Sequence, residues 1–422
     1  MKLLRVFRFA KYRTRDIKEF LSKRLIEIHL ERNPEAKMLC RRCGSEMEPG
    51  HGSYPVRLQH MPIFTNHCYL ILRRHKGFCR QCKCVRSEKL GFVSEESPHK
   101  TTEYAFWVGR LCEIAPVHEV ARLMEESSST TWRLDLKRMK RLLSSYKIPR
   151  PRRISVDEVY ARKKPKPGET RDDRFFTVIC DLDTGKAIWV SSSRRKEALD
   201  DFFLIIGKRA CENIEVVACD LHEAYASSVK EHCVNATVVW DRFHLMQIFD
   251  EAVNETRKDL HGDSARGSEQ SRLSRGKYRF LFLKKSTRRT AEEREHINDL
   301  IRENSDFLKL EVIKEAMHEF FNARNVDDGK VIWDNIGEWI WQAGFKPLMK
   351  WYKNMASRWS QLANYFKYRV TSALSEGINN VIKTLKKSAY GYRNMDYFKL
   401  KILQRCGYLN SRYIQEAQTE YI

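Results

Sequence analysis

Three acidic residues occupy positions that suit a metal-dependent reaction. Asp157 ends a β-like run, ISVDEV, and Asp220 ends a later one, VVACDL, so in an α/β sheet both could project from strand ends into one crevice. Glu376 lies in SALSEGINNVIKTLKK, whose pattern predicts a helix. Carboxylates are the ligands that Mg²⁺ prefers. Two such ions about 4 Å apart can activate a water or a 3′ hydroxyl and stabilise the leaving oxygen.

Crowded carboxylates repel one another, so the three acids together imply bound cations. An Asp at a strand end is also a common cap or turn former, and spacing alone does not decide between the two interpretations. Of the neighbouring acids, Glu158 would point to the opposite sheet face and is interpreted as structural. Asp181 and Asp183 in DLDTG form a turn. Glu223, three residues beyond Asp220, stays a competitor.

Two Cys-x-x-Cys pairs predict a structural zinc site in the layout of a four-cysteine ribbon. The four expected ligands are Cys40, Cys43, Cys79 and Cys82. The alternative is that these are ordinary thiols of a small core. Cys84 could replace Cys82 as a ligand, and Cys68 could simply face the core.

Residues 103 to 143 predict three short helices with a Ser-rich cap before the third, which favours a helix-turn-helix. A major groove could receive the first turn of the third helix, where Ser129, Thr130 and Arg133 would meet base edges. The cations of that helix are Arg133, Lys137, Arg138, Lys140 and Arg141. Three-helix bundles that do not bind DNA fit the same pattern.

The composition agrees with a nucleic-acid partner. Among 422 residues, 78 Lys and Arg oppose 55 Asp and Glu, giving a formal net charge of +23. Arg and Lys break the N-terminus before a signal-peptide core could form, and no segment reaches the roughly 20 apolar residues that cross a bilayer. We therefore expect a soluble, cytoplasmic protein without a membrane partner. Few of the 12 Cys are then expected in disulfides.

The length of the chain and the order of its sequence patterns predict a multidomain α/β protein of two to four folded units. Near the N-terminus, apolar residues recur at mostly helical spacing and suggest a helix or arm. They are Ile17, Phe20, Leu21, Leu25, Ile28 and Leu30. Short β-rich and helical runs alternate from about 154 to 260, which predicts a mixed sheet flanked by helices. A polar stretch and a Trp-rich, all-helical region follow. The expected domains are a basic helix or arm (1–36), a zinc-binding domain (37–97), a helix-turn-helix (98–148), a first core part (149–260), a helical insertion (261–370) and a second core part with the Glu-bearing helix (371–422).

Three stretches of the chain resemble the blocks of insertion-sequence transposases of the ISL3 (ISL-three) group. They are SVDEVYARK, ACDLHEAYASSVKEHCVNATVVWDRFHLMQ and YRVTSALSEGINNVIKTLKKSAYGYRN. The cysteine pairs and the helix-turn-helix occur in the same order in that family, so the resemblance spans residues from about 38 to 410.

The resemblance implies a ribonuclease H-like core with an Asp, Asp, Glu triad at Asp157, Asp220 and Glu376, and a helical insertion between the last two. It also implies an Asp-x-x-His after the fifth strand, matched by Asp241 and His244. The His could contact a phosphate or the attacking group, or could make a structural hydrogen bond at a strand end.

Two further sets of residues are candidates for DNA contact. On the predicted Glu376 helix, polar residues recur at spacings of three or four, namely Asn379, Asn380, Lys383, Lys387 and Tyr390. Contact with DNA and a solvated basic face are the two interpretations, and we favour contact. In the insertion, Trp residues could stack on a flipped base, although Trp at helical spacing is more often core. These are Trp333, Trp339, Trp341, Trp351 and Trp359.

The sequence thus predicts a transposase with two Mg²⁺ or Mn²⁺ ions at Asp157, Asp220 and Glu376, His244 beside them, and structural Zn²⁺. Its expected partners are terminal inverted repeats, target DNA and at least one further protomer. The alternatives are a non-catalytic DNA-binding regulator derived from such an enzyme and a structure-selective nuclease on the same fold.

Overall fold

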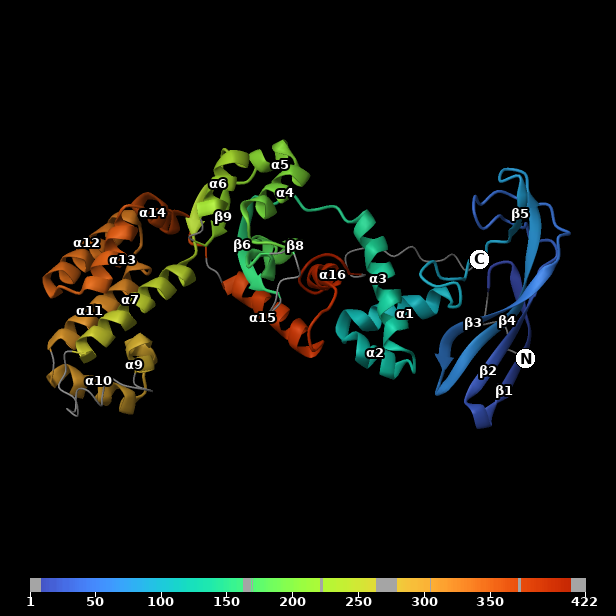
Figure 1. Cartoon of the computed structure of the whole chain (residues 1–422), viewed down its shortest axis with the longest axis horizontal. Helices are drawn as coiled ribbons and strands as arrows, with labels where there is room; N and C mark the ends of the chain where they lie inside the picture. Colours follow the sequence, from blue (N-terminus) through green and yellow to red (C-terminus); the bar gives the residue numbers. More distant parts are fainter. Residues whose placement is uncertain are drawn as a thin grey trace. The chain divides into compact units, whose positions relative to one another are not determined.

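The computed structural model describes residues 9–161, 168, 170–220, 223–262, 279–303, 305–370 and 373–410. The chain forms two compact units. One comprises residues 1–147 and 383–422, and the other residues 148–382, so the boundary crosses a single helix (Figure 1). Within the described ranges no helix has the length and apolar character of a membrane span.

The first unit begins with a five-stranded sheet in the order β1-β2-β4-β3, with β5 paired to β4. The β1–β2 and β3–β4 pairs are antiparallel, whereas β2 and β4 run parallel. Ile28, Leu58 and Leu70 are fully buried at its centre. The strands are β1 (Tyr12–Phe20), β2 (Leu25–Arg32), β3 (Ser53–Ile63), β4 (Asn66–Cys79) and β5 (Cys84–Ser87).

The predicted helix or arm over residues 1–36 is wrong for the part that the structure describes. Strands β1 and β2 form a hairpin joined by a short 3₁₀ turn, Leu21–Lys23. In β2 every second residue is buried, Ile26, Ile28 and Leu30 among them. This period of two is a strand signal. The apparent helical spacing arises because it includes Leu21, which lies in the turn and is 76% exposed.

Three helices follow, as predicted: α1 (Thr102–Ile114), α2 (Val117–Leu123) and α3 (Ser128–Ser145). The hydroxyl of Ser127 accepts a hydrogen bond from the Thr130 amide and caps α3, which agrees with the Ser-rich cap. Arg138 departs from the prediction because it is buried, where its guanidinium donates to Glu113 at 2.7 Å. Gly109 makes room for it, since a Cβ there would lie 2.2 Å from Arg138 Cδ.

Helix α16 (Met395–Cys406) packs against these helices, so the predicted second core part, 371–422, needs correction. Residues 383–410 belong to the first unit. The Tyr397 hydroxyl donates to buried Asp135 of α3 at 2.6 Å, and Lys401 donates to the Cys112 carbonyl. Most residues of α16 are buried, Phe398 and Ile402 among them, so the helix is covered on more than one side.

The second unit contains a five-stranded mixed sheet in the order β10-β9-β6-β7-β8. β6, β7 and β8 are antiparallel neighbours, whereas β9 and β10 run parallel to β6. This is the ribonuclease H-like arrangement that the resemblance implied. The strands are β6 (Arg153–Tyr160), β7 (Phe175–Asp181), β8 (Lys186–Ser191), β9 (Val216–Cys219) and β10 (Thr237–Trp240).

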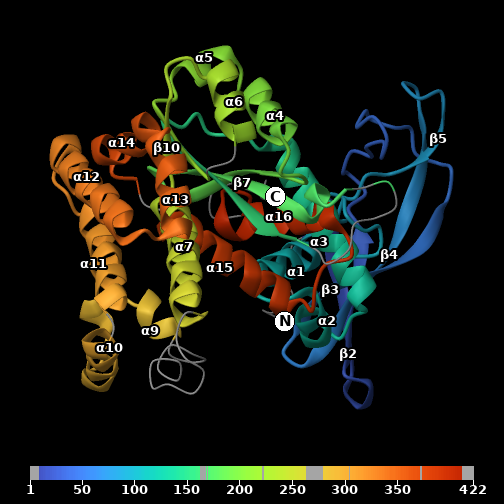
Figure 2. The same cartoon turned by 60° about the vertical axis from the view of Figure 1, so that its left-hand side comes forward.

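Helices lie on both sides of this sheet. Three lie together on one side, and α15 (Ala373–Ser388) lies on the other (Figures 1 and 2). The three are α4 (Lys196–Ile206), α5 (Lys208–Glu212) and α6 (Glu223–His232). Apolar side chains of α4, such as Leu199 and Phe202, are fully buried. The segments predicted as strands and helices over 154–260 are confirmed.

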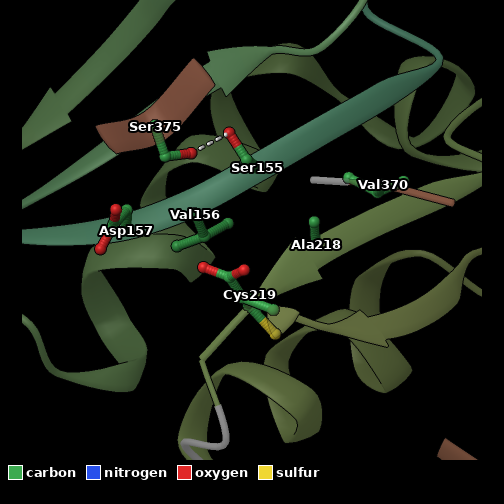
Figure 3. Close-up of a pocket in the computed structure, with 8 residues that line it drawn as sticks. Ser155, Val156, Asp157, Ala218, Cys219, Val370 and Ser375 are labelled. Atoms are coloured by element: carbon green, nitrogen blue, oxygen red, sulfur yellow. Dashed lines mark hydrogen bonds between the residues drawn. The ribbon is translucent and has the colours of Figure 1, made fainter. Parts of the chain in front are cut away.

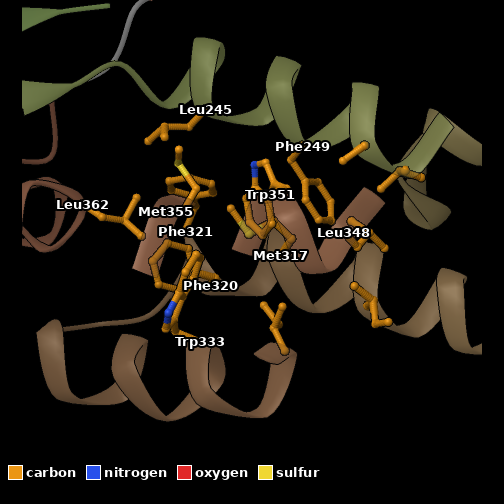
Figure 4. Close-up of a cluster of buried hydrophobic side chains, with 14 of the residues drawn as sticks. Leu245, Phe249, Met317, Phe320, Phe321, Trp333, Leu348, Trp351, Met355 and Leu362 are labelled. Atoms are coloured by element: carbon orange, nitrogen blue, oxygen red, sulfur yellow. The ribbon is translucent and has the colours of Figure 1, made fainter. Parts of the chain in front are cut away.

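A helical bundle completes the second unit (Figure 4). Helix α7 (Arg242–Gly262), which directly follows β10, contributes Leu245 and Phe249 to its core, so the bundle begins before the predicted insertion boundary at 261. The other helices are α9 (Arg279–Leu283), α10 (Ala291–Glu303), α11 (Ser305–Phe320), α12 (Val326–Ala343), α13 (Lys346–Ala356) and α14 (Trp359–Tyr368).

The Trp residues of the bundle belong mainly to its core. Trp333 and Trp351 are buried, with ring centroids 5.6 Å apart, and Trp359 packs against the same cluster. Trp339 and Trp341 are partly exposed, at 37% and 46%. The core interpretation therefore holds for Trp333 and Trp351.

Candidate active site and zinc site

Strand β6 sends alternate side chains to opposite sides of the sheet. Asp157 accepts a hydrogen bond from Asn379 of α15 at 2.7 Å. Its neighbour Glu158 faces the other way and accepts a hydrogen bond from Tyr225 of α6 at 3.1 Å. This alternation is the period of two of a strand. The prediction that Glu158 points to the opposite face is confirmed.

Asp157, Asp220 and His244 converge from three segments. Asp157 lies on the central strand, Asp220 directly follows β9 and His244 lies in the first turn of α7. One ligand atom from each lies within 4.8 Å of the others. His244 Nε2 is 2.5 Å from Asp220 Oδ1 and 3.8 Å from Asp241 Oδ2. Figure 3 shows the small pocket beside this cluster, where Asp157 and Cys219 come from adjacent strands.

The electrostatics of the cluster favour a cation. Burial, and after it the negative charge of Asp220, raise the pKa of Asp157 to about 6. Burial alone would lower the pKa of His244, but its hydrogen bond to Asp220 and the surrounding carboxylates raise it. Two half-buried carboxylates this close repel each other unless a positive charge lies between them. Oxygen ligands of this kind fit Mg²⁺ or Mn²⁺.

Glu376 is not among the three clustered residues. Its side chain is exposed and lines a neighbouring pocket with residues of α7, Arg242 and Asp250 among them. Residues three apart on a helix are neighbours, so Glu376 lies one turn before Asn379, whose side chain bonds Asp157. The helix that carries Glu376 is thus attached at the cluster, and its carboxylate lies to one side.

Two contacts that hold α15 against β6 were not expected from the sequence. The Ser375 and Ser155 hydroxyls are 3.0 Å apart and both residues are buried (Figure 3). The Asn379 amide reaches Asp157. Asn379 was predicted as a DNA contact, yet its Nδ2 donates to a carboxylate of the cluster. Its spacing from Glu376 was the available signal, but spacing does not reveal the partner.

The competing acids lie outside the cluster. Asp181 accepts hydrogen bonds from the Asp183 amide and the Thr184 hydroxyl, as expected of a turn. Glu223 is 83% exposed in its side chain and pairs with Arg358 at 2.7 Å. Glu223 of α6 therefore belongs to an ion pair at the surface.

The four predicted cysteines form a second ligand group. Cys43 Sγ lies 3.4 Å from Cys79 Sγ and 3.6 Å from Cys82 Sγ, and Cys40 Sγ lies 3.9 Å from Cys82 Sγ. All four sulfurs lie within 4.8 Å of one another. One tetrahedral ion fits such a group, and this supports structural Zn²⁺.

Hydrogen bonds from the Ser45 side chain and amide lower the pKa of Cys43 to about 6, which favours the thiolate that zinc requires. The two other cysteines considered as candidates lie elsewhere. Cys84 Sγ donates to the Cys82 carbonyl at 3.2 Å and lies outside the group. Cys68 is fully buried in the core of the first sheet.

The predicted DNA contacts on α3 and α15 are largely exposed. Ser129, Arg133 and Lys137 are exposed on α3, and Thr130 is half-buried. The Arg133 guanidinium donates to the Ser129 carbonyl, and Lys137 donates to the Glu96 carbonyl. On α15, the side chains of Lys383 and Lys387 are exposed.

Two protein-family models match the chain, a zinc-finger model in its N-terminal part and a transposase model after it. The DDE transposase family model of the ISL3 type, described as "Transposase", matches residues 154–402. The model described as "zinc-finger of transposase IS204/IS1001/IS1096/IS1165" matches residues 36–82. The first match contains all three predicted acids, and the second contains the four clustered cysteines.

Two kinds of relative align with much of the chain. The transposase for insertion sequence element IS1001 of Bordetella parapertussis is 25% identical over 381 residues, which cover 90% of this chain and 91% of the relative. Transposases for insertion sequence element IS1557 from two Mycobacterium tuberculosis strains are 22% identical over 326 residues, 70% of each chain. The family match spans more than half of the sequence, and the chain therefore belongs to the ISL3 family of DDE insertion-sequence transposases.

Proposed function

We propose that the protein binds the terminal inverted repeats of its insertion sequence, cleaves the DNA there and joins the 3′ hydroxyls to target DNA. The observation that carries this proposal is the convergence of Asp157, Asp220 and His244 within the family match. Because two ends must be brought together, the reaction requires at least two protomers.

Asp157, Asp220 and Glu376 would hold two Mg²⁺ or Mn²⁺ ions. When bound, these ions activate the attacking oxygen and stabilise the leaving oxygen. Asn379 holds the Asp157 carboxylate in one orientation, since its amide donates to Oδ2. His244 does the same for Asp220, and its proposed role in the reaction is to contact a phosphate or the attacking group.

Other parts of the chain would select and hold the DNA. The exposed first turns of α3, with Ser129, Thr130 and Arg133, suit base edges in a major groove, and Lys137 suits the backbone. Lys383 and Lys387 suit phosphates because they follow Glu376 on the same helix. The zinc ion would stabilise the fold of the ribbon, which has only a small core of its own.

The test uses the purified full-length protein, Mg²⁺ and a DNA fragment that carries the element ends. Asp157→Asn, Asp220→Asn and Glu376→Gln should each reduce cleavage and joining by more than about 100-fold, since even partners of metal ligands contribute about 10 to 100-fold. Glu223→Gln is the matched control, because that carboxylate is exposed and outside the cluster.

Each alternative predicts a different result. A regulator would bind the ends and leave both strands intact. A structure-selective nuclease would cut branched DNA and join nothing. Full activity of Glu376→Gln would remove Glu376 from the reaction and leave a site built on Asp157, Asp220 and His244.

A further inference from the structure

A pocket of about 900 Å³ lies within the second unit on the side where Glu376 projects. The start of α7, the segment from Leu283 to Arg288 and Glu376 itself contribute to its wall. Its cations are Arg242, Lys284, Lys285 and Arg288, and its acids are Asp250, Glu251 and Glu376. Phe243 also lines it and is 52% exposed.

Three of the cations lie on one short segment, residues 284–288 between α9 and α10, which we call the basic loop. Arg288 is exposed, and the described part of the chain provides no ion-pair partner for it. Lys285 is 27% exposed in its side chain and lies 3.7 Å from Glu319. Lys284 pairs with Glu293 at 2.6 Å. The two cations nearest the end of the loop are therefore weakly engaged or free to bind an anion.

Charged side chains of α11, together with Arg289, hold the basic loop in place. Lys314 of α11 has a fully buried side chain, and its ammonium donates to the Lys284 carbonyl at 3.0 Å. Glu315 accepts from both the amide and the hydroxyl of Ser286, at 2.9 and 2.8 Å. Arg289, the residue that follows the loop, donates to Glu311 and to the Leu281 carbonyl.

Such an arrangement is expensive for a surface loop. Removing the Lys314 and Arg289 charges from water is unfavourable, and ion pairs with Glu311 only offset that penalty. Well-packed apolar residues would stabilise the bundle equally well. The result of the buried pairs is a loop whose backbone is fixed at the Lys284 carbonyl and the Ser286 amide, and placing cations against a ligand requires such a fixed backbone.

We propose that the basic loop and Arg242 bind backbone phosphates of the DNA strand that leaves the scissile bond on the Glu376 side. The occupant is assigned by the chemistry of the lining, because cations beside an exposed aromatic ring are the combination that tracks a single nucleic-acid strand. Phe243 then supplies a surface on which a base can stack. This proposal rests on the proposed function and names where its substrate runs.

The first test measures the salt dependence of binding to a DNA end by the full-length protein. Each phosphate contact contributes roughly 0.9 to the slope of log K against log salt on duplex DNA and roughly 0.7 on a single strand. The double variant Lys285→Ala with Arg288→Ala should therefore reduce the slope by about 1.4 to 1.8. The control is Lys309→Ala with Lys350→Ala, two exposed lysines of α11 and α13 outside the pocket, which should keep the wild-type slope.

The second test needs no substitution in the loop. Acetylation of lysines in the presence and absence of the same DNA, read by mass spectrometry, should show protection of Lys285 and none of Lys309. An unchanged slope in the loop variant, or equal acetylation of Lys285 with and without DNA that the wild type binds, overturns the proposal. Failure of the proposed function is a separate result, since the wild type would then bind the ends without cutting them, or not bind them.

Discussion

The side-chain amide of Asn379 donates a 2.7 Å hydrogen bond to Oδ2 of Asp157, a residue 222 positions away in the sequence. This contact fixes α15 against β6 at the central carboxylate of the cluster. Glu376 lies one turn earlier on the same helix, so the bond also fixes the segment of α15 that carries Glu376. One amide thereby positions two of the three acids that we propose as metal ligands.

Asn379→Ala should reduce DNA cleavage by about 10 to 100-fold, the usual effect of losing a partner that orients a metal ligand. Binding of the DNA ends should stay within about 2-fold, and the Mg²⁺ concentration for half-maximal cleavage should rise. Cleavage rates measured over a series of Mg²⁺ concentrations check both expectations.

The matched control is Asn354→Ala, an exposed asparagine of α13. It should leave cleavage unchanged. Reduced DNA binding by Asn379→Ala, with an unchanged Mg²⁺ requirement, would show instead that Asn379 contacts DNA, as the sequence alone suggested.

Much of the second unit could be predicted because local sequence patterns identify its strands and helices. Asp220 directly follows β9, a short apolar run whose residues are all buried, and buried strands of a mixed sheet require such runs. The prediction that Asp157 ends its strand is wrong, because β6 continues past it to Tyr160. The cysteine pairs are equally local, since two residues between thiols allow both to reach one ion. His244 came from the resemblance alone.

The predictions that were wrong concern features that depend on packing between residues far apart in the sequence. β1 is mostly exposed, so its side chains carry no burial pattern that could identify it as a strand. The bond from Tyr397 to Asp135 joins residues 262 positions apart, and it assigns α16 to the first unit. Arg138 looked like a surface cation because the sequence does not show that Gly109 opens a buried site for it.

Two arginines of α3 should respond in opposite ways. Arg133 is exposed, so Arg133→Ala should keep the melting temperature and weaken binding of the DNA ends by about 1–3 kcal/mol, roughly 5 to 150-fold. Arg138 is buried with Glu113 and Asp135, so Arg138→Ala should destabilise the first unit by up to about 3–5 kcal/mol, because it removes the buried cation that faces both carboxylates. Thermal unfolding and binding measurements on the same samples separate the two. A stable Arg138→Ala protein that loses only DNA affinity would contradict this assignment.

Cys82→Ser and Cys84→Ser should differ in zinc content. The Cys82 sulfur belongs to the group of four, whereas the Cys84 sulfur donates to a backbone carbonyl. Cys82→Ser should bind less than one zinc per chain and lose stability, since the ribbon gains folding energy from the metal. Cys84→Ser should retain one zinc per chain by atomic absorption. The reverse result would make Cys84 the fourth ligand.

Asp250→Asn should stabilise the protein, and the gain should depend on pH. Asp250 lies on α7, and burial raises its pKa from 3.8 to about 6, although the charge of Lys314 opposes the rise. Its Oδ1 is buried without a hydrogen-bond partner among the described residues. A folded state that keeps its proton longer than the unfolded chain loses stability as the pH rises.

The sign follows from the two pKa values. Below about pH 3.8 Asp250 is protonated in both states and asparagine should add little. Between about 3.8 and 6 the unfolded chain ionises first, so the native protein is progressively destabilised, and above 6 the penalty is complete. Allowing for partial exposure, we expect a gain of about 1–2 kcal/mol at pH 7.5, roughly 2–4 °C for each kcal/mol. The control is Asp334→Asn, because Asp334 is exposed and forms a surface ion pair with Lys330. It should change little at either pH. Equal gains at pH 4 and pH 7.5 would show that asparagine acts through packing or hydrogen bonding, and that the buried charge of Asp250 is not the cause.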